Sequence, residues 1–250
     1  MSKIKLSEIS AMPPANVTKE SIKAETASLK ERLNELQRVM YAQEKYSILL
    51  VLQGMDASGK DGTVRNVFKG VSPIGIEVKS FKKPTDEEFA HDFLWRVHKK
   101  VPSKGMITVF NRSHYEDVLI QRVHSWIDEE RVHQRFKHIN AFENLLQEEN
   151  DTVIIKVFLH VSKEDQLLRL NERREMVHKH WKHNDNDFKE RKHWDKYMEA
   201  YEDCFEQCNA IPWHIVPTGK NWYKEYLVAK HVVEALEKLD LKYPALESDM

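Results

Sequence analysis

The chain has 250 residues, a length that suits one α/β domain with its own hydrophobic core. Its 39 lysines and arginines nearly balance its 40 aspartates and glutamates, so overall charge favours neither nucleic acid nor an acidic membrane as a partner. The N-terminal residues lack the apolar run of a signal peptide, and no stretch approaches the roughly 20 apolar residues that span a bilayer. The sequence therefore predicts a soluble, cytoplasmic protein.

Residues 1–18 contain Pro13 and Pro14 without strong periodicity and are predicted to form an extended arm. Apolar residues then recur at spacings of three, four and seven over residues 19–42, which predicts an amphipathic helix capped by Thr18. Its apolar face is expected to pack on the main body or on a second subunit. Residues 241–250 are expected to form a C-terminal tail after a single domain over 19–240.

The central part of the chain alternates short apolar runs with longer charged segments of helical spacing. The runs predicted to be strands are 47–54, 76–81, 106–110, 152–161 and 213–217. This alternation predicts a three-layer α/β/α sandwich with a parallel sheet, which binds ligands beyond the carboxyl ends of its strands.

A glycine-rich segment, GMDASGKDG, follows the first predicted strand and precedes a helical pattern. Gly54, Gly59 and Lys60 match the spacing GxxxxGK of a phosphate-binding loop, in which backbone N–H groups face phosphate oxygens and the lysine reaches the transferred group. The alternative is a turn that binds no ligand. The residues expected to contact phosphate here, besides Lys60, are Gly54, Ala57, Ser58, Gly59, Asp61 and Gly62.

Two aspartates distinguish this loop. Asp61 stands where the pattern usually has the Ser or Thr that ligates magnesium. Asp56 lies inside the loop, where a carboxylate would repel phosphate unless a divalent cation lay between them. We therefore predict that Asp56 holds Mg²⁺, directly or through water, with Mn²⁺ as an alternative metal.

A second polar motif, NRSHYEDVLIQRV, follows the third predicted strand. Arg112 is suited to bridge donor and acceptor phosphates with its planar guanidinium, although pairing with Glu116 or Asp117 is the alternative. Asn111, Glu116 and Asp117 are candidates for nucleotide or metal contacts, and the two acids equally fit a solvated helix start. Arg122 is either a second phosphate contact or a surface charge.

Residues 169–196 are rich in Arg, Lys and His and lie between the fourth and fifth predicted strands. A basic lid at this place would neutralise a transferred phosphoryl group and exclude water; a solvated charged face is the alternative. The lid residues expected to contact phosphate are Arg173, Arg174, Lys179, Lys182 and Arg191, and Arg169 can share their helix face.

Two other chemistries receive little support. His178, His180, His183 and His193 do not pair with the cysteines at zinc-site spacings. Cys204 and Cys208 lie four residues apart in a helical stretch and are predicted to be reduced thiols.

Taken together, GMDASGKDG, FKKPTDEE, FNRSHYEDVLIQRVH and the basic segment resemble the successive signatures of family-2 polyphosphate kinases from about residue 20 to 240. The resemblance implies a thymidylate-kinase-like P-loop kinase fold with a helical basic lid. It further implies magnesium-dependent, reversible phosphoryl transfer between inorganic polyphosphate and purine nucleotides, in a homo-oligomer (dimer or tetramer). Asn111, where other subgroups have Asp, resembles the subgroup that accepts both AMP and ADP.

The same resemblance assigns residues to roles. Asp56, Lys60 and Arg112 match the family's metal-binding, phosphate-loop and phosphate-bridging residues, and Lys82 and Lys83 match a basic segment near the acceptor nucleotide. The rival functions are an ATP-dependent nucleoside monophosphate kinase, disfavoured by Asp61 and the strongly basic lid, and a non-enzymatic P-loop regulator, disfavoured because Lys60 and Arg112 are both present.

Overall fold

The computed structural model describes residues 4–246. It contains a five-stranded, all-parallel sheet in the order β2-β3-β1-β4-β5. The strands are β1 (Ser47–Gln53), β2 (Ile76–Ser80), β3 (Ile107–Asn111), β4 (Thr152–His160) and β5 (Trp213–Pro217). All five predicted strands are confirmed, each to within one residue at either end.

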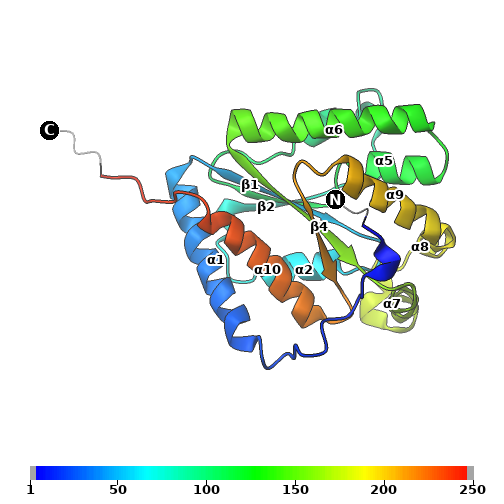
Figure 1. The fold of residues 1–250 in the computed structure, drawn as a ribbon, viewed down its shortest axis with the longest axis horizontal. Coiled ribbons are helices and arrows are strands. Elements are labelled where there is room, and N and C mark those ends of the chain that lie inside the picture. The colour runs from blue at the N-terminus through cyan, green and yellow to red at the C-terminus, as the bar shows by residue number, and fades with distance from the viewer. Residues whose placement is uncertain (1–3, 247–250) are drawn as a thin grey trace.

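Helices cover both faces of the sheet, as the sequence predicted (Figure 1). One face is covered by α1 (Lys23–Gln43), α2 (Lys60–Val67) and α10 (Asn221–Glu237), and the other by α5 (Glu116–Val123), α6 (Glu129–Asn150) and α9 (Trp194–Gln207). Every residue of β1 is buried because this strand is central and has a hydrophobic cluster on each side. Within the described residues, no helix is long and apolar enough to cross a membrane.

The remaining helices of the described residues lie in the N-terminal arm and in the connections between strands. They are η1 (Leu6–Glu8), η2 (Pro73–Gly75), α3 (Asp86–Phe89), α4 (Trp95–His98), α7 (Lys163–Glu175), η3 (Val177–Lys182), α8 (Asp185–Glu190) and η4 (Arg191–His193). The predicted lid is thus built from the end of α7, from η3, α8 and η4, and from the start of α9.

The first long helix begins later than predicted. Thr18 and Ser21 exchange hydrogen bonds, each side-chain oxygen accepting from the other residue's backbone N–H at 3.1 Å, so Thr18 caps a turn rather than the helix. The helix begins at Lys23. Its buried residues Leu33 and Met40 pack against α10 of the same chain, which decides the open choice between main body and second subunit in favour of the main body.

The N-terminal arm is docked on the domain and contains a short 3-10 helix where the sequence predicted only extended chain. Leu6 is buried and its N–H donates to Glu202 Oε1 at 2.8 Å. Further along, His160 contacts the carbonyl oxygen of Ile9 at 2.9 Å, and the Gly219 N–H donates to that of Ala11 at 2.8 Å. The arm therefore connects α9 to the loop between β5 and α10.

Cys204 lies in α9 and Cys208 directly follows that helix. Both are buried free thiols, as predicted, and burial raises the pKa of each.

Candidate active site

The glycine-rich loop joins the end of β1 to the start of α2, the predicted context for phosphate binding. Two of its glycines are required by geometry. Gly54 has φ +144°, and a Cβ there would lie 2.7 Å from the carbonyl oxygen of Leu159. Gly59 has φ +100°, and a Cβ there would lie 2.5 Å from Lys224 Nζ. The loop is thus fitted closely between β4 and α10.

Lys60 is folded back under this loop and is only 8% exposed. Its Nζ donates to the carbonyl oxygens of Gly54 at 2.6 Å and Met55 at 3.1 Å. Burial and, secondarily, the charge of Arg112 lower the pKa of Lys60 to about 8. A cation held this way by neutral carbonyls alone is suited to receive an anion.

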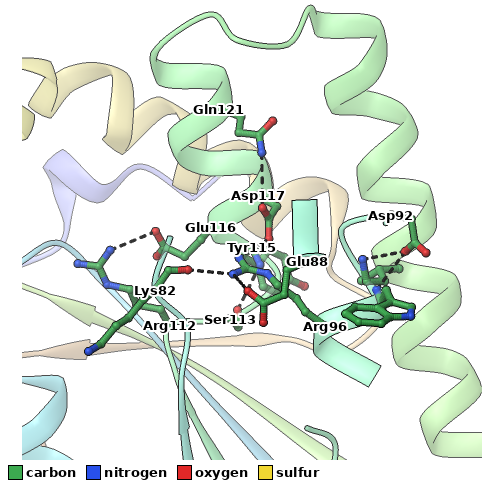
Figure 2. A network of polar contacts seen from close by, with 12 residues as sticks. Lys82, Glu88, Asp92, Arg96, Arg112, Ser113, Tyr115, Glu116, Asp117 and Gln121 are labelled. Carbon is green, nitrogen blue, oxygen red and sulfur yellow. Dashed lines mark hydrogen bonds and ion pairs between the residues drawn. The ribbon is translucent and has the colours of Figure 1, made fainter. Parts of the chain in front are cut away.

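Arg112 faces the loop from the residue after β3. Its backbone has φ +61°, a strained conformation held in part by the hydrogen bond from its N–H to the Leu52 carbonyl at 3.0 Å. The guanidinium pairs with Asp56 and lies 3.5 Å from Glu116 Oε2, as Figure 2 shows for Glu116. Burial raises the pKa of Glu116. Three residues predicted from two motifs, Asp56 from the first and Arg112 and Glu116 from the second, therefore meet in one cluster.

The carboxylates of this cluster fit a divalent cation. Asp187, which the sequence did not indicate, is also buried, and burial followed by the charge of Asp56 raises its pKa to about 6. Among the described residues no group of three or more His, Cys, Asp or Glu side chains forms a ready metal cage. Magnesium commonly binds through one or two carboxylates, water and substrate phosphates, so a site with Asp56 as its protein ligand is compatible with this arrangement.

Asp61 joins the loop to the lid. Its carboxylate accepts from Asn111 Nδ2 and from Lys182 Nζ, each at 2.8 Å. The hydrogen bonds of Lys182 and Asn111 lower the pKa of Asp61 against the raising effect of burial, which is the largest single influence. Asp61 therefore bonds both to Asn111 and to Lys182 of the lid.

The other lid cations divide into two groups. Arg169 donates to the carbonyl oxygens of Ala57 at 3.1 Å and Ser58 at 3.3 Å, and Arg191 donates to Gln166, which in turn donates to the Asp56 carbonyl. These contacts bring α7 onto the loop. The remaining lid residues bond within the lid: Arg173 to Asp187 at 2.8 Å, Lys179 to Glu172 at 2.6 Å, and Arg174 over the Phe188 ring.

Residues predicted to contact nucleotide or a second phosphate have distinct surroundings. Lys82 and Lys83 are exposed just beyond β2. Asp117 is buried and pairs with Arg96. All three guanidinium nitrogens of Arg122 donate to Glu129 or Asp203, which supports the surface-charge alternative for that arginine.

Sequence reasoning missed Lys224, whose buried Nζ lies 3.0 Å from Asn221 Oδ1 and 3.5 Å from the Gly59 carbonyl. Burial lowers its pKa to about 8. The available signal was its spacing of four from Val228 and eight from Val232, which places a lysine on the apolar face of α10.

A glycine-rich loop with a buried lysine, opposed by an arginine and covered by cationic helices, defines a P-loop phosphotransferase. A family model described as polyphosphate kinase 2 (PPK2) matches residues 16–244. The chain belongs to the polyphosphate kinase 2 family, which confirms the resemblance stated from its motifs.

Individual relatives support the same family assignment. The AMP/ADP-polyphosphate phosphotransferase of Meiothermus ruber is 47% identical over 89% of this chain and 84% of its own length. The ADP-polyphosphate phosphotransferase of Rhodopseudomonas palustris is 40% identical over 86% and 78%. The crystal structure of polyphosphate kinase 2 from Arthrobacter aurescens TC1 superimposes with a TM-score of 0.94 at 41% identity, covering 100% of this chain and 91% of that one. The predicted fold class is confirmed.

Proposed function

We propose that this protein transfers the terminal phosphoryl group of inorganic polyphosphate to AMP and to ADP, reversibly, giving ADP and ATP. The observation that carries the proposal is the convergence of Lys60, Arg112 and Asp56 beneath a basic lid. The names of the M. ruber and R. palustris relatives support both the donor and the acceptors.

The chain's own residues position and neutralise charge. The attacking oxygen of a nucleotide phosphate is already anionic, so no strong general base is required. Lys60 leaves its loop carbonyls to bind the transferred group, and the fork of Arg112 spans donor and acceptor oxygens. Arg173, Arg174, Lys179, Lys182 and Arg191 face the polymer when the lid closes, while Lys82, Lys83 and Glu116 lie on the acceptor side.

Magnesium, with Mn²⁺ as a substitute, is the proposed cofactor, and Asp56 is its proposed protein ligand. When bound, it would neutralise charge on the transferring phosphates. Asp56 must then exchange its pairing with Arg112 for the metal, which frees that guanidinium for phosphate. An Asp56→Asn enzyme should therefore require at least about tenfold more Mg²⁺ for half-maximal activity.

The deciding experiment supplies AMP, Mg²⁺ and polyphosphate as the only phosphoryl donor and follows nucleotide products by chromatography. ADP followed by ATP is expected. ADP alone would restrict the acceptor to AMP, and no product unless ATP is the donor would indicate an ATP-dependent nucleoside monophosphate kinase. Lys60→Ala should lose at least about a hundredfold in turnover, because a transition-state charge contact is removed.

We further propose that the enzyme works in the cytoplasm, where its nucleotide acceptors are held, as a homo-oligomer, either a dimer or a tetramer. Because the apolar face of α1 is occupied by α10, the subunit interface lies elsewhere. Light scattering after gel filtration measures the subunit number directly.

A further inference from the structure

Arg96, in the short helix α4, carries one of the few buried guanidinium groups of the described chain, at 5% exposure. Its Nη2 donates to Asp117 Oδ2 at 2.9 Å, and its Nη1 donates to the carbonyl oxygen of Lys82 at 2.9 Å and lies 3.6 Å from Glu88 Oε2. Figure 2 shows these partners around one guanidinium. Arg96 thus joins two segments, residues 82–88 and the first turn of α5.

Each of these partners lies in a segment next to the candidate active site. Lys82 stands just beyond β2, in the basic segment that we propose for the acceptor side. Glu88 forms the capping box of α3 with Thr85, which fixes the chain that follows Lys82. Asp117 lies in the first turn of α5, next to Glu116, which contacts Arg112. One side chain therefore sets the acceptor segment against the residues around the transferred phosphate.

The ion pair between Arg96 and Asp117 carries a large desolvation cost. The Asp117 side chain is 7% exposed and that of Arg96 is 5% exposed, so each charge is taken out of water and must be compensated by the other. A guanidinium can serve three acceptors in one plane, whereas the ammonium of lysine is a point charge on a flexible stem. The contacts of Arg96 therefore depend on the planar shape of the guanidinium as well as on its charge.

We infer that Arg96 is a positioning residue for the acceptor nucleotide: it locks the Lys82 to Glu88 segment onto the first turn of α5. Arg96 touches none of the phosphate-loop residues. Its loss therefore changes acceptor binding and leaves polyphosphate binding in place. This inference rests on the proposed function.

The test compares Michaelis constants of Arg96→Lys and Arg96→Gln with the wild type, varying AMP at saturating polyphosphate and polyphosphate at saturating AMP. We expect KM for AMP to rise about tenfold, a change of the size that one charged hydrogen bond contributes. KM for polyphosphate should stay within about twofold. Arg96→Lys should recover little, because it cannot span Asp117 and Lys82 together.

A purely structural role gives a different pattern. Leu146→Ala removes a buried side chain of α6 outside this network and is the matched control for lowered stability. If the Arg96 variants, like this control, lose only active fraction with both KM values unchanged, or if both KM values rise together, the inference is overturned. In Arg96→Gln, adding Asp117→Asn should change KM for AMP little further, because the partners act as one unit.

Failure of the proposed function is recognised separately. If the wild-type protein makes no product from polyphosphate, equilibrium binding of AMP replaces KM. A weaker Kd for AMP in Arg96→Gln then still supports the positioning role, and an unchanged Kd overturns it.

Discussion

At the scale of single residues, backbone carbonyls of the glycine-rich loop accept hydrogen bonds from the lysine of the same loop. Lys60 is bonded to two carbonyls of the loop that it serves, with a pKa lowered to about 8 chiefly by burial. The charge that attracts phosphate is therefore present below pH 8 and is lost as the pH rises through that value. Physiological pH lies close to this titration.

We accordingly expect the Kd for polyphosphate, measured without nucleotide, to be constant below about pH 7 and to weaken by up to about tenfold by pH 9. Lys60→Arg keeps its charge at every such pH and should show a smaller change. Lys224, whose pKa is also lowered to about 8, accounts for what remains. An identical pH profile in Lys60→Arg would contradict the assignment of this titration to Lys60.

Another residue-scale prediction concerns the buried pair beneath the second motif. Lys156 donates to Glu143 at 2.8 Å, and the Tyr115 hydroxyl donates to the same carboxylate at 2.9 Å. Burial would raise the pKa of Glu143, but the bond to His114 and the charge of Lys156 lower it below its ordinary 4.5. A lowered folded-state pKa gives stability that is present above pH 4.5 and is lost as the pH falls.

Glu143→Gln should therefore lower the free energy of unfolding by about 3–5 kcal/mol at pH 7, because it leaves a buried lysine without its counter-charge. The difference from the wild type should shrink in urea titrations carried out well below pH 4.5. A constant difference at every pH would show that the carboxylate charge is not what stabilises this region.

At the scale of elements, the lid is bonded directly to the loop. Lys182 reaches Asp61, and Arg169 and Gln166 reach loop carbonyls. The Lys182 bond is the contact made by the outer part of the lid, η3, whereas the other two come from α7. Releasing it should loosen η3, which would still be bonded to α7 through Lys179 and Glu172 and through Arg173 and the Lys182 carbonyl.

We expect Asp61→Ala to increase cleavage of the 176–193 segment in limited proteolysis severalfold, because local opening controls protease access. Asp185→Ala, which removes an exposed carboxylate bonded to His183 inside the lid, is the matched control and should leave the rate near that of the wild type. Equal rates in wild type and Asp61→Ala would show that this bond does not hold the lid.

The N-terminal arm gives the second prediction at this scale. Leu6 is 2% exposed and inserts into the cluster formed with α5, α6 and α9. Leu6→Ala should cost about 2–5 kcal/mol in urea unfolding, the usual range for a buried leucine. Ile74→Ala, at a largely exposed side chain, should cost little, and equal losses at both positions would contradict the docking of the arm.

The elements also show where sequence reasoning succeeded and failed. Strands of continuous apolar residues were placed to within a residue because burial on both faces leaves a strong local pattern. The glycine-rich loop and Arg112 were found because each follows a strand. Arg96, Asp187 and Lys224 are not assigned to the site from the sequence, because their surroundings depend on how separate elements pack together, which hydrophobic spacing and motif matches do not specify.

At the scale of the whole molecule, two hydrophobic clusters flank a sheet whose strands are all parallel, and the candidate catalytic residues follow the carboxyl ends of β1 and β3. Different parts of the fold therefore provide stability and chemistry. The clusters fix the strands, while loops and short helices at their carboxyl ends hold the chemistry.

This strand order has a consequence for how the chain is made. The central strand β1 is wholly buried between β3 and β4, which belong to much later parts of the sequence. On a ribosome β1 emerges first, and its apolar residues wait for both neighbours while residues 54–151 are synthesised. During that interval the nascent chain exposes an unpaired apolar strand, so we expect its yield in a cell to depend on chaperone capacity and on the pace of translation.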